Sequence, residues 1–380
     1  YPPKHEGYAE DFPEWHERDL ADMVRRDRNH PSIFMWSIGN EIDYPNDPYC
    51  HPLFETMTGN NDANKPAKER QYDPDKPNAE RLSVIAKELA AIVRTQDTTR
   101  PVTLAAAFPE LSSHIGFFDA LDVVGYNYKE HLYEESHKRF PDKPFLGSEN
   151  GGGYQEWCAV RDNAYISGQF LWTGIDYLGE AQGWPIHGSG AGLLTLAGFE
   201  KPSYYRRQSL WSTMPMIHLT TAAASEDQGE FTPVSESWNY PHGEQILVKC
   251  YTNLPAAIIT LNDTVLGVYC KPEQSDCIYF TLPYAPGVLH AYGFDTVAMA
   301  NEAVNSDNSR LASHAAAVHA LYTTSVACRM DIQVWPETHF YKSDKALYQL
   351  SVTLQDADGQ RTYHDNTLLW ASVENGRILG

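Results

Sequence analysis

The sequence predicts an α/β domain followed by an all-β region, and three observations support this fold class. Between residues 1 and about 212, helical patterns alternate with short apolar strands, which is typical of a parallel sheet covered by helices. After Met214-Pro215 the pattern changes to alternating apolar and polar residues, which indicates antiparallel strands. The length of 380 residues is enough for two or three domains with their own cores.

The first predicted helix leads directly into the first predicted strand. The helix is indicated by apolar residues on one face, namely Trp15, Leu20, Met23 and Val24, and Asn29-His30-Pro31 ends it. The apolar run 33–38 predicts a buried strand that stops at Gly39-Asn40-Glu41. A polar loop follows from about residue 46 to 75, and long loops after strands often shape a substrate pocket.

Further helices and strands alternate along the next 140 residues. A second helix is indicated by the period of Leu82, Ile85, Leu89, Ile92 and Val93, and others are expected at 154–166 and 204–211. Together with the first strand, this predicts five strands that end near Glu41, Ala106, Asn127, Glu149 and Trp172. Five parallel strands fit part of a closed eight-stranded barrel or an open doubly wound sheet.

The positions of the glycines help to distinguish a closed barrel from an open doubly wound sheet. No Gly-rich phosphate loop follows the first strand, which argues against a doubly wound nucleotide-binding sheet. The Gly-rich residues 188–192 come after the last strand, and we interpret them as a flexible loop rather than a phosphate cradle.

The C-terminal part predicts β domains. Residues 217–326 are expected to form an antiparallel sandwich, with strands at 245–250, 258–261, 277–282 and 287–292. Residues 327–380 predict a second, incomplete β domain, with alternation at 350–354, a strand at 368–373 and an Asn375-Gly376 hairpin. The Asp356/Asp358 pair lacks the spacing of a calcium loop and is interpreted as a turn.

Charge and cysteine content exclude several classes. The formal net charge is −21 and no Lys/Arg cluster is present, which argues against nucleic acid and membrane as partners. None of the six cysteines forms a C-x-x-C pair, and we expect buried free thiols rather than a disulfide among Cys250, Cys270 and Cys277. No signal peptide is visible, and this assigns no compartment.

Two carboxylates stand at the ends of different predicted strands. Glu41 ends the first strand and Glu149 ends the fourth, and in parallel α/β proteins the carboxyl ends of strands carry the chemistry. A pair of carboxylates is what glycoside hydrolysis requires. No G-x-S-x-G elbow is present, which argues against an α/β-hydrolase.

Several segments, in the same order along the chain, resemble one enzyme family. Arg28-Asn29-His30-Pro31-Ser32, an apolar strand and Gly39-Asn40-Glu41 are similar to its signature. The other similar segments are 122–128, 147–149, 170–180, 196–211 and 246–292. The family is glycoside hydrolase family 2, the β-galactosidase and β-glucuronidase group.

The resemblance implies a fold and an activity. The fold is a partial (β/α)8 TIM barrel, strands four to eight, followed by immunoglobulin-like β-sandwich domains. The implied bounds are 1–213 for the barrel, 217–326 for the first sandwich and 327–380 for an incomplete second one. The activity is retaining hydrolysis of terminal β-galactosides, with Glu41 as acid/base and Glu149 as nucleophile.

The resemblance also implies residues that bind the sugar. Asn40 is expected to hydrogen-bond the sugar 2-hydroxyl, and either Tyr128 or Tyr126 is expected to contact the nucleophile. Trp172 is expected to form a wall against the apolar face of the sugar, and Trp184 is a second candidate for such a wall. His30 is expected near the pocket, with a structural role beside the Pro31 bend as the alternative.

Metal and sugar preference follow from neighbouring segments. Some β-galactosidases of the family bind magnesium beside the acid/base, but its other ligands come from strands that do not precede Tyr1, so no metal or other cofactor is assigned. Family glucuronidases hold the sugar carboxylate with Asn-x-Lys after the eighth strand. Residues 186–192 contain no Lys, which favours a neutral sugar.

The resemblance further implies a piece of a longer enzyme, because the first three barrel strands and the domains before them do not precede Tyr1. Such a barrel would expose two apolar edges, so self-association or a partner that covers them is expected. The alternatives are a catalytically inert carbohydrate-binding remnant, or a family member that acts on a glucuronide or a mannoside.

Overall fold

The computed structural model describes residues 8–43, 49–55, 72–225, 229–305, 310–335 and 347–379. The chain forms two compact units, Tyr1–Gly192 and Leu193–Gly380. Most of the predicted polar loop at 46–75 lies outside the described residues. The helix predicted at 204–211 is α6 (Pro202–Trp211), and it contacts the first strands of the second unit. The domain bounds implied by the sequence therefore stay a prediction.

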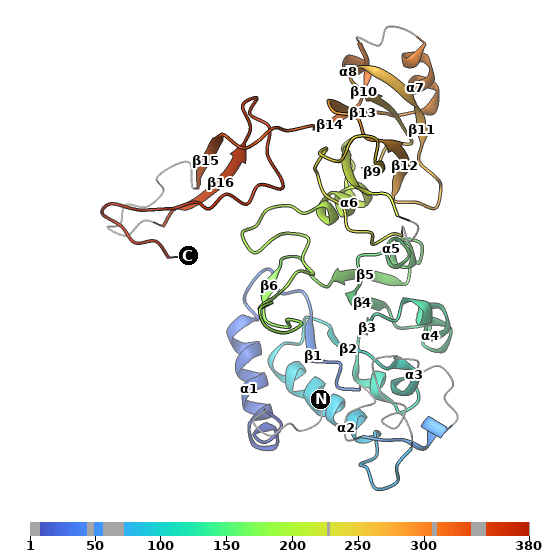
Figure 1. The fold of residues 1–380 in the computed structure, drawn as a ribbon. Helices are drawn as coiled ribbons and strands as arrows, with labels where there is room; N and C mark the ends of the chain where they lie inside the picture. The colour runs from blue at the N-terminus through green and yellow to red at the C-terminus, as the bar shows by residue number, and fades with distance from the viewer. Residues whose placement is uncertain are drawn as a thin grey trace. The chain divides into compact units, whose positions relative to one another are not determined.

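A five-stranded parallel sheet forms the centre of the first unit (Figure 1). Its strands are β1 (Trp36–Asn40), β2 (Val102–Ala106), β3 (Val124–Asn127), β4 (Phe145–Asn150) and β5 (Ile166–Leu171). Their order in the sheet equals their order in the chain. A doubly wound sheet reverses direction at a switch point, so the observed order rules that alternative out.

The sheet curls strongly. The ring of Phe34, just before β1, lies 6.3 Å from the ring of Phe170 on β5, measured between centroids. In a flat sheet the first and fifth strands would be about 19 Å apart, which is four strand spacings. The two edge strands therefore approach each other, as expected of an arc of a barrel.

Helices and short turns connect the strands. The connecting elements are α1 (Phe12–Asp27), η1 (Pro52–Glu55), α2 (Arg81–Gln96), α3 (Pro109–Ser112), η3 (Phe117–Ala120), η4 (Glu130–Leu132), α4 (Tyr133–Arg139) and α5 (Tyr154–Arg161). Helices α1 and α2 pack on each other (Figure 1). Helix α2 buries Leu82, Leu89 and Val93, which confirms the predicted helical face. Helix α5 is shorter than the predicted 154–166 because β5 already begins at Ile166.

A small hairpin follows β5. Strands β6 (Tyr177–Leu178) and β7 (Gly188–Ser189) pair antiparallel, so the predicted flexible loop at 188–192 begins with a strand. The amide of Gly192 donates a 2.8 Å hydrogen bond to Asp176 Oδ1, which holds the end of this segment against its start.

Two antiparallel sheets form a sandwich in the second unit. One sheet has the order β11-β10-β13-β14 and the other has the order β12-β9-β8. Their bounds are β8 (Ile217–Ala223), β9 (Gln245–Thr252), β10 (Ala256–Leu261), β11 (Thr264–Cys270), β12 (Cys277–Pro283), β13 (Val288–Phe294) and β14 (Ala317–Tyr322). The four strands predicted from the sequence are β9, β10, β12 and β13, whereas β8, β11 and β14 were not predicted.

Side chains from both sheets share one core. Trp238 is fully buried in it, together with residues from β8, β9, β10, β12, β13 and β14. Helix α7 (Val297–Val304) covers the other face of the four-stranded sheet, beside the short α8 (Leu311–His314). The Thr296 hydroxyl caps α7 by accepting from the Met299 amide at 3.2 Å.

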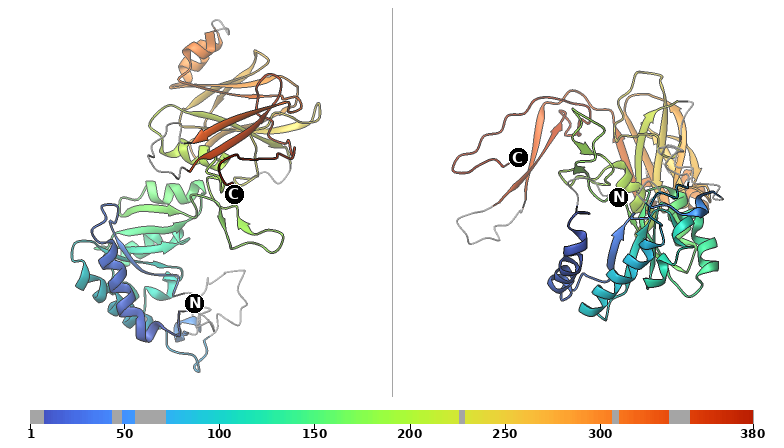
Figure 2. Two further views of the ribbon diagram at one scale, coloured as in Figure 1. Left: turned by 90° about the vertical axis from the view of Figure 1, so that its left-hand side faces the viewer. Right: turned by 90° about the horizontal axis from the view of Figure 1, so that it is seen from below.

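The last two strands, β15 (Arg329–Trp335) and β16 (Gln349–Gln355), pair as an antiparallel ribbon, drawn in red in Figure 2. The prediction of a strand at 368–373 is wrong, because among the described residues this stretch pairs with no other strand. All six cysteines are free thiols; Cys250 and Cys277 are buried as predicted, whereas Cys270 is exposed and the prediction of burial is wrong for it. Within the described ranges, no helix is long and apolar enough to cross a bilayer.

Candidate active site

The two predicted carboxylates meet at the carboxyl edge of the parallel sheet. Glu41 directly follows β1 and Glu149 lies near the end of β4. Glu41 has φ 53° and Tyr128, directly after β3, has φ 55°. Non-glycine residues rarely adopt this left-handed conformation, and such strained positions concentrate at functional sites. Their amides anchor them to neighbouring strands, with bonds of 2.8 Å to the Ala105 carbonyl and 2.9 Å to the Glu149 carbonyl.

One amide nitrogen links the two carboxylates. Asn127 Nδ2 lies 3.1 Å from Glu41 Oε1 and 3.3 Å from Glu149 Oε2. The same nitrogen lies 3.0 Å from Asn40 Oδ1. The Ser148 hydroxyl donates to Asn127 Oδ1 at 2.8 Å. The ends of β1, β3 and β4 thus hold Asn40, Glu41 and Glu149 around a single buried donor, because Asn127 is only 1% exposed.

Burial and neighbouring charges set the ionisation of Glu149. Its pKa is raised above the ordinary value, first by burial and then by the negative charges of Glu41 and Glu180. A hydrogen bond from Tyr128 Oη to Glu149 Oε1, 2.8 Å long, acts in the opposite direction. The pKa of the Tyr128 phenol is itself raised, by burial and by its bond to the Glu149 carboxylate. Tyr128 therefore stays a hydrogen-bond donor.

Trp172 stands beside the hairpin that follows β5. Its amide donates to the Asn150 carbonyl at 3.0 Å, which fixes its backbone at the end of β4. Its indole is 42% exposed and meets Tyr177 edge-on, with ring centroids 5.6 Å apart. The Tyr177 hydroxyl donates to Glu180. An exposed indole of this kind offers a flat apolar surface at the carboxyl end of β5.

Two of the predicted site residues, Tyr126 and His30, are not brought to the carboxylates. Tyr126 is fully buried, and its hydroxyl donates to Ser136 at 2.8 Å, so Tyr128 and not Tyr126 contacts Glu149. His30 precedes β1 and its amide binds the Asp27 carbonyl at the end of α1, so it lies at the opposite end of the strand from Glu41. Trp184 is 89% exposed in the β6–β7 hairpin.

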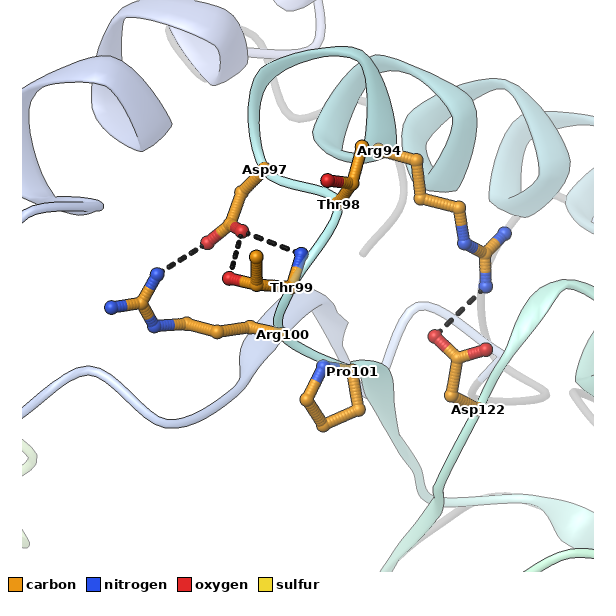
Figure 3. Close-up of a pocket in the computed structure, with 7 residues that line it drawn as sticks. All are labelled: Arg94, Asp97, Thr98, Thr99, Arg100, Pro101 and Asp122. Carbon is orange, nitrogen blue, oxygen red and sulfur yellow. Dashed lines mark hydrogen bonds and ion pairs between the residues drawn. The ribbon is translucent and has the colours of Figure 1, made fainter.

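A pocket of about 420 Å³ lies at the amino edge of the same sheet and has a structural role (Figure 3). Its lining residues are Arg94, Asp97, Thr98, Thr99, Arg100, Pro101 and Asp122. Both arginines are paired, Arg94 with Asp122 at 3.0 Å and Arg100 with Asp97 at 2.6 Å. Because the charges neutralise each other and this edge is opposite to Glu41, the pocket offers no free group for chemistry.

Within the described part of the chain, one group has metal-ligand chemistry, and it lies in the second unit. His218 on β8, Glu236 and His319 on β14 offer ligand atoms within 4.8 Å of one another. His319 Nδ1, however, accepts the Leu219 amide at 3.1 Å, so the proton of the neutral ring sits on Nε2. A protonated ring nitrogen has no lone pair for a metal, and this arrangement does not fit one.

Asn127, Ser148 and Glu180 were not predicted as site residues. The sequence places Asn127 at the end of a predicted strand, and this was the available signal for it. Ser148 needs the space left by Gly125, where a Cβ atom would lie 2.8 Å from Ser148 Oγ and 2.5 Å from the Leu104 carbonyl. The negative charge of Glu180 contributes to the raised pKa of Glu149, and its carboxylate accepts from Tyr177.

A curled parallel sheet with two carboxylates at its carboxyl edge is the arrangement found in barrel-type glycosidases. Residues 7–182 match the family described as glycosyl hydrolases family 2, TIM barrel domain, and this part of the chain belongs to that family. Residues 243–297, within the sandwich, match a family described as a domain of unknown function.

Curated relatives and solved structures agree with this family. The chain is 32% identical over 337 residues to the beta-galactosidase BoGH2A of Bacteroides ovatus, covering 74% of this chain and 37% of that protein. It is 29% identical over 315 residues to a provisionally named beta-glucuronidase of Formosa agariphila, covering 74% and 28%. A glycosyl hydrolase family 2 member from Bacteroides cellulosilyticus superposes with a TM-score of 0.72 at 28% identity, covering 93% and 42%. The chain thus spans less than half the length of these relatives.

Proposed function

We propose that this chain carries the catalytic carboxylates of a retaining glycosidase that cleaves terminal β-galactosides. The main support is that a single nitrogen, Asn127 Nδ2, lies 3.1 Å from Glu41 Oε1 and 3.3 Å from Glu149 Oε2. Because Glu41 Oε1 and Glu149 Oε2 contact the same nitrogen, their separation cannot exceed these two distances added together. This upper limit lies below the range of inverting enzymes. Inverting enzymes hold their carboxyl groups roughly 6.5–9.5 Å apart to admit a water, whereas retaining enzymes hold them roughly 5–5.5 Å apart.

The reaction takes two displacements. The Glu149 carboxylate attacks the anomeric carbon, the bond from that carbon to the glycosidic oxygen breaks, and Glu41 gives its proton to the departing oxygen. The Glu41 carboxylate then takes a proton from water, whose oxygen attacks the same carbon. The ester bond to Glu149 breaks and the sugar leaves with its original configuration.

Three residues support these steps. Asn40, beside Glu41, is proposed to hydrogen-bond the sugar 2-hydroxyl, a contact that strengthens in the transition state. Tyr128 donates to Glu149 and stabilises the ionised nucleophile. Trp172 supplies an exposed aromatic face for the apolar side of the sugar ring.

The fold supports the finer architecture that we propose. Strands β1 to β5 correspond to barrel strands four to eight, because they are consecutive and parallel and because the sheet curls. The three- and four-stranded sheets correspond to an immunoglobulin-like sandwich of seven strands. β1 and β5 each pair with one strand among the described residues, so we expect self-association or a partner to cover these edges. A monodisperse monomer in light scattering would contradict that expectation.

A neutral sugar is the preferred substrate. No Lys is present in residues 186–192 to pair with a sugar carboxylate, and the BoGH2A relative is named a β-galactosidase. Glucuronide hydrolysis is the second candidate, since the Formosa agariphila relative is named for it.

A panel of aryl β-glycosides tests the proposal, with Glu149→Gln as the control. Turnover of the galactoside that disappears in the variant, with a product that keeps the β configuration in its first NMR spectrum, supports it. Turnover of the glucuronide alone would correct the sugar. Binding of galactose without turnover of any glycoside would favour an inert carbohydrate-binding remnant.

A further inference from the structure

The Asn127 amide nitrogen has more neighbouring acceptor atoms than hydrogens to donate. Its Nδ2 carries two hydrogens but lies within bonding distance of Asn40 Oδ1, Glu41 Oε1 and Glu149 Oε2. The two carboxylates cannot both be satisfied at full strength while Asn40 also accepts. The donor must therefore favour the carboxylate that carries the negative charge, because hydrogen bonds to charged groups are roughly twice as strong.

Ser148 fixes which way this amide points. Its hydroxyl donates to Asn127 Oδ1 at 2.8 Å, so the oxygen is turned away from the carboxylates and the nitrogen faces them. The reversed amide would place an oxygen against two carboxylates. Gly125 makes this arrangement possible, because a side chain there would collide with Ser148 Oγ and with the Leu104 carbonyl.

In the proposed double displacement the negative charge changes place. Glu149 is ionised before it attacks, and Glu41 is ionised once it has given its proton to the leaving group. At that moment the Glu149 charge has been consumed in the ester bond. A fixed donor within reach of both carboxylates can follow this exchange with almost no movement.

We propose that Asn127, oriented by Ser148, is a positioning residue that donates to Glu149 in the free enzyme and to Glu41 in the glycosyl-enzyme. It holds the two carboxylates at the separation that the retaining reaction needs and offsets their mutual repulsion. The inference rests on the proposed function for its kinetic part, whereas its electrostatic part can be measured without turnover.

The first test compares two replacements of Asn127. Asn127→Asp keeps the shape but places a third carboxylate beside the pair, and Asn127→Ala removes the donor and leaves space. If Asn127 acts by donation, the Asp variant loses more kcat/KM on an aryl β-galactoside than the Ala variant, and the Ala variant loses about 10²-fold. If Asn127 only fills space, the isosteric Asp variant is the better enzyme, and this result would overturn the proposal.

Ser148→Ala extends the test with a matched control. It frees the amide to reverse and is expected to lower kcat/KM about tenfold. Ser136→Ala removes a buried hydroxyl that accepts from Tyr126 rather than from this network, and kcat/KM should stay unchanged. Equal losses in the two serine variants would mean that Ser148 acts only through stability. If Asn127→Ala does not fold, the serine pair decides alone.

A titration separates this proposal from the proposed function. Carboxyl ¹³C NMR of glutamate-labelled chain, assigned with Glu149→Gln, follows the ionisation of Glu149 in wild type and in Asn127→Ala. Loss of the donor is expected to raise the Glu149 midpoint by about one pH unit. An unchanged midpoint refutes the electrostatic role even if the wild type hydrolyses galactosides. A wild type that hydrolyses no glycoside refutes the proposed function, and the titration still decides whether Asn127 donates to Glu149.

Discussion

The Tyr128 hydroxyl donates a 2.8 Å hydrogen bond to Glu149 Oε1, from a tyrosine held in the left-handed backbone region at the end of β3. The bond opposes the effect of burial, which raises the pKa of Glu149, and it therefore favours the ionised carboxylate that the proposed nucleophile requires. Tyr126, two residues earlier, points its hydroxyl to Ser136 instead. The two tyrosines thus provide a natural pair for mutation.

Removal of the Tyr128 hydroxyl should shift the acidic limb of the pH profile. In Tyr128→Phe the ionised form of Glu149 loses a donor, so its pKa rises further. Because Glu149 must be ionised to attack, the acidic limb of kcat/KM moves to higher pH, by about one unit. Tyr126→Phe should leave that limb in place. The profile in both variants on one aryl β-galactoside checks this, and equal shifts would argue against a specific role of Tyr128.

Glu41→Gln should make the rate depend on the leaving group. Without the acid, kcat/KM for a phenyl galactoside should fall about 10²–10⁴-fold. For a dinitrophenyl galactoside, whose leaving group needs no proton, kcat/KM should fall little. Azide should then accelerate turnover, because it replaces the water that Glu41 no longer activates. Glu149→Gln should lower kcat/KM equally for both substrates. Uniform loss on both substrates in Glu41→Gln would contradict its role as the acid.

The carboxylates could be predicted from the sequence because their signal is local. An apolar strand that ends at Gly39-Asn40-Glu41 marks the carboxyl edge of the sheet, and the run before Glu149 does the same. The Asn127 network could not be predicted, because its partners come from separate strands and meet only through the parallel register of β3 with β4. The choice between Tyr126 and Tyr128 depended on a positive φ, which no pattern of residue types reveals at a tyrosine.

Other misses have equally physical causes. Strand β8 was missed because a histidine and two threonines are buried within it, so its sequence looks polar. His30 was expected near the pocket from its motif, but β1 extends away from it and carries Glu41 at the far end. The stretch 368–373 has the residue types of a strand, but residue types alone do not supply a partner.

Asp97 should stabilise the fold at neutral pH, and this stabilisation should be lost in acid. It accepts hydrogen bonds from Trp36 Nε1 at 3.0 Å, from the Thr99 amide and hydroxyl, and from Arg100 at 2.6 Å, and these bonds lower its pKa. A lowered folded pKa means that the stabilisation is present above the unfolded pKa of about 4 and is lost as the pH falls through the folded value.

Asp97→Asn should therefore cost about 3 kcal/mol of unfolding free energy at pH 7, because it removes the carboxylate that neutralises the Arg100 guanidinium. The difference from wild type should shrink below about pH 4. Asp27→Asn, which breaks the exposed pair with Arg26, is the control and should leave stability nearly unchanged. Urea unfolding at pH 7 and pH 3.5 measures both, and a difference that stays constant with pH would contradict the assignment.

Asp43 ties the loop that follows Glu41 to the loop that follows β2. Its two oxygens accept from the Ala107 and Phe108 amides at 3.0 Å each, and Oδ2 also accepts from the Ser112 hydroxyl at 2.5 Å. The side chain is only 3% exposed, and burial raises its pKa above the ordinary value for an aspartate. Each of the two oxygens therefore faces a backbone N–H donor.

Asp43→Asn should therefore destabilise the chain and weaken catalysis together. Whichever oxygen becomes an NH₂ group, it faces a backbone N–H, and an unsatisfied buried donor costs about 1–3 kcal/mol. The displaced loop carries Glu41 with it, so kcat should fall about tenfold while the acidic limb set by Glu149 stays in place. Asp119→Asn, an exposed aspartate that pairs with Lys87 at 3.5 Å, is the control. Urea unfolding and the pH profile of the same preparations decide, and a stable Asp43→Asn variant with full activity would show that the two loops hold their positions without this carboxylate.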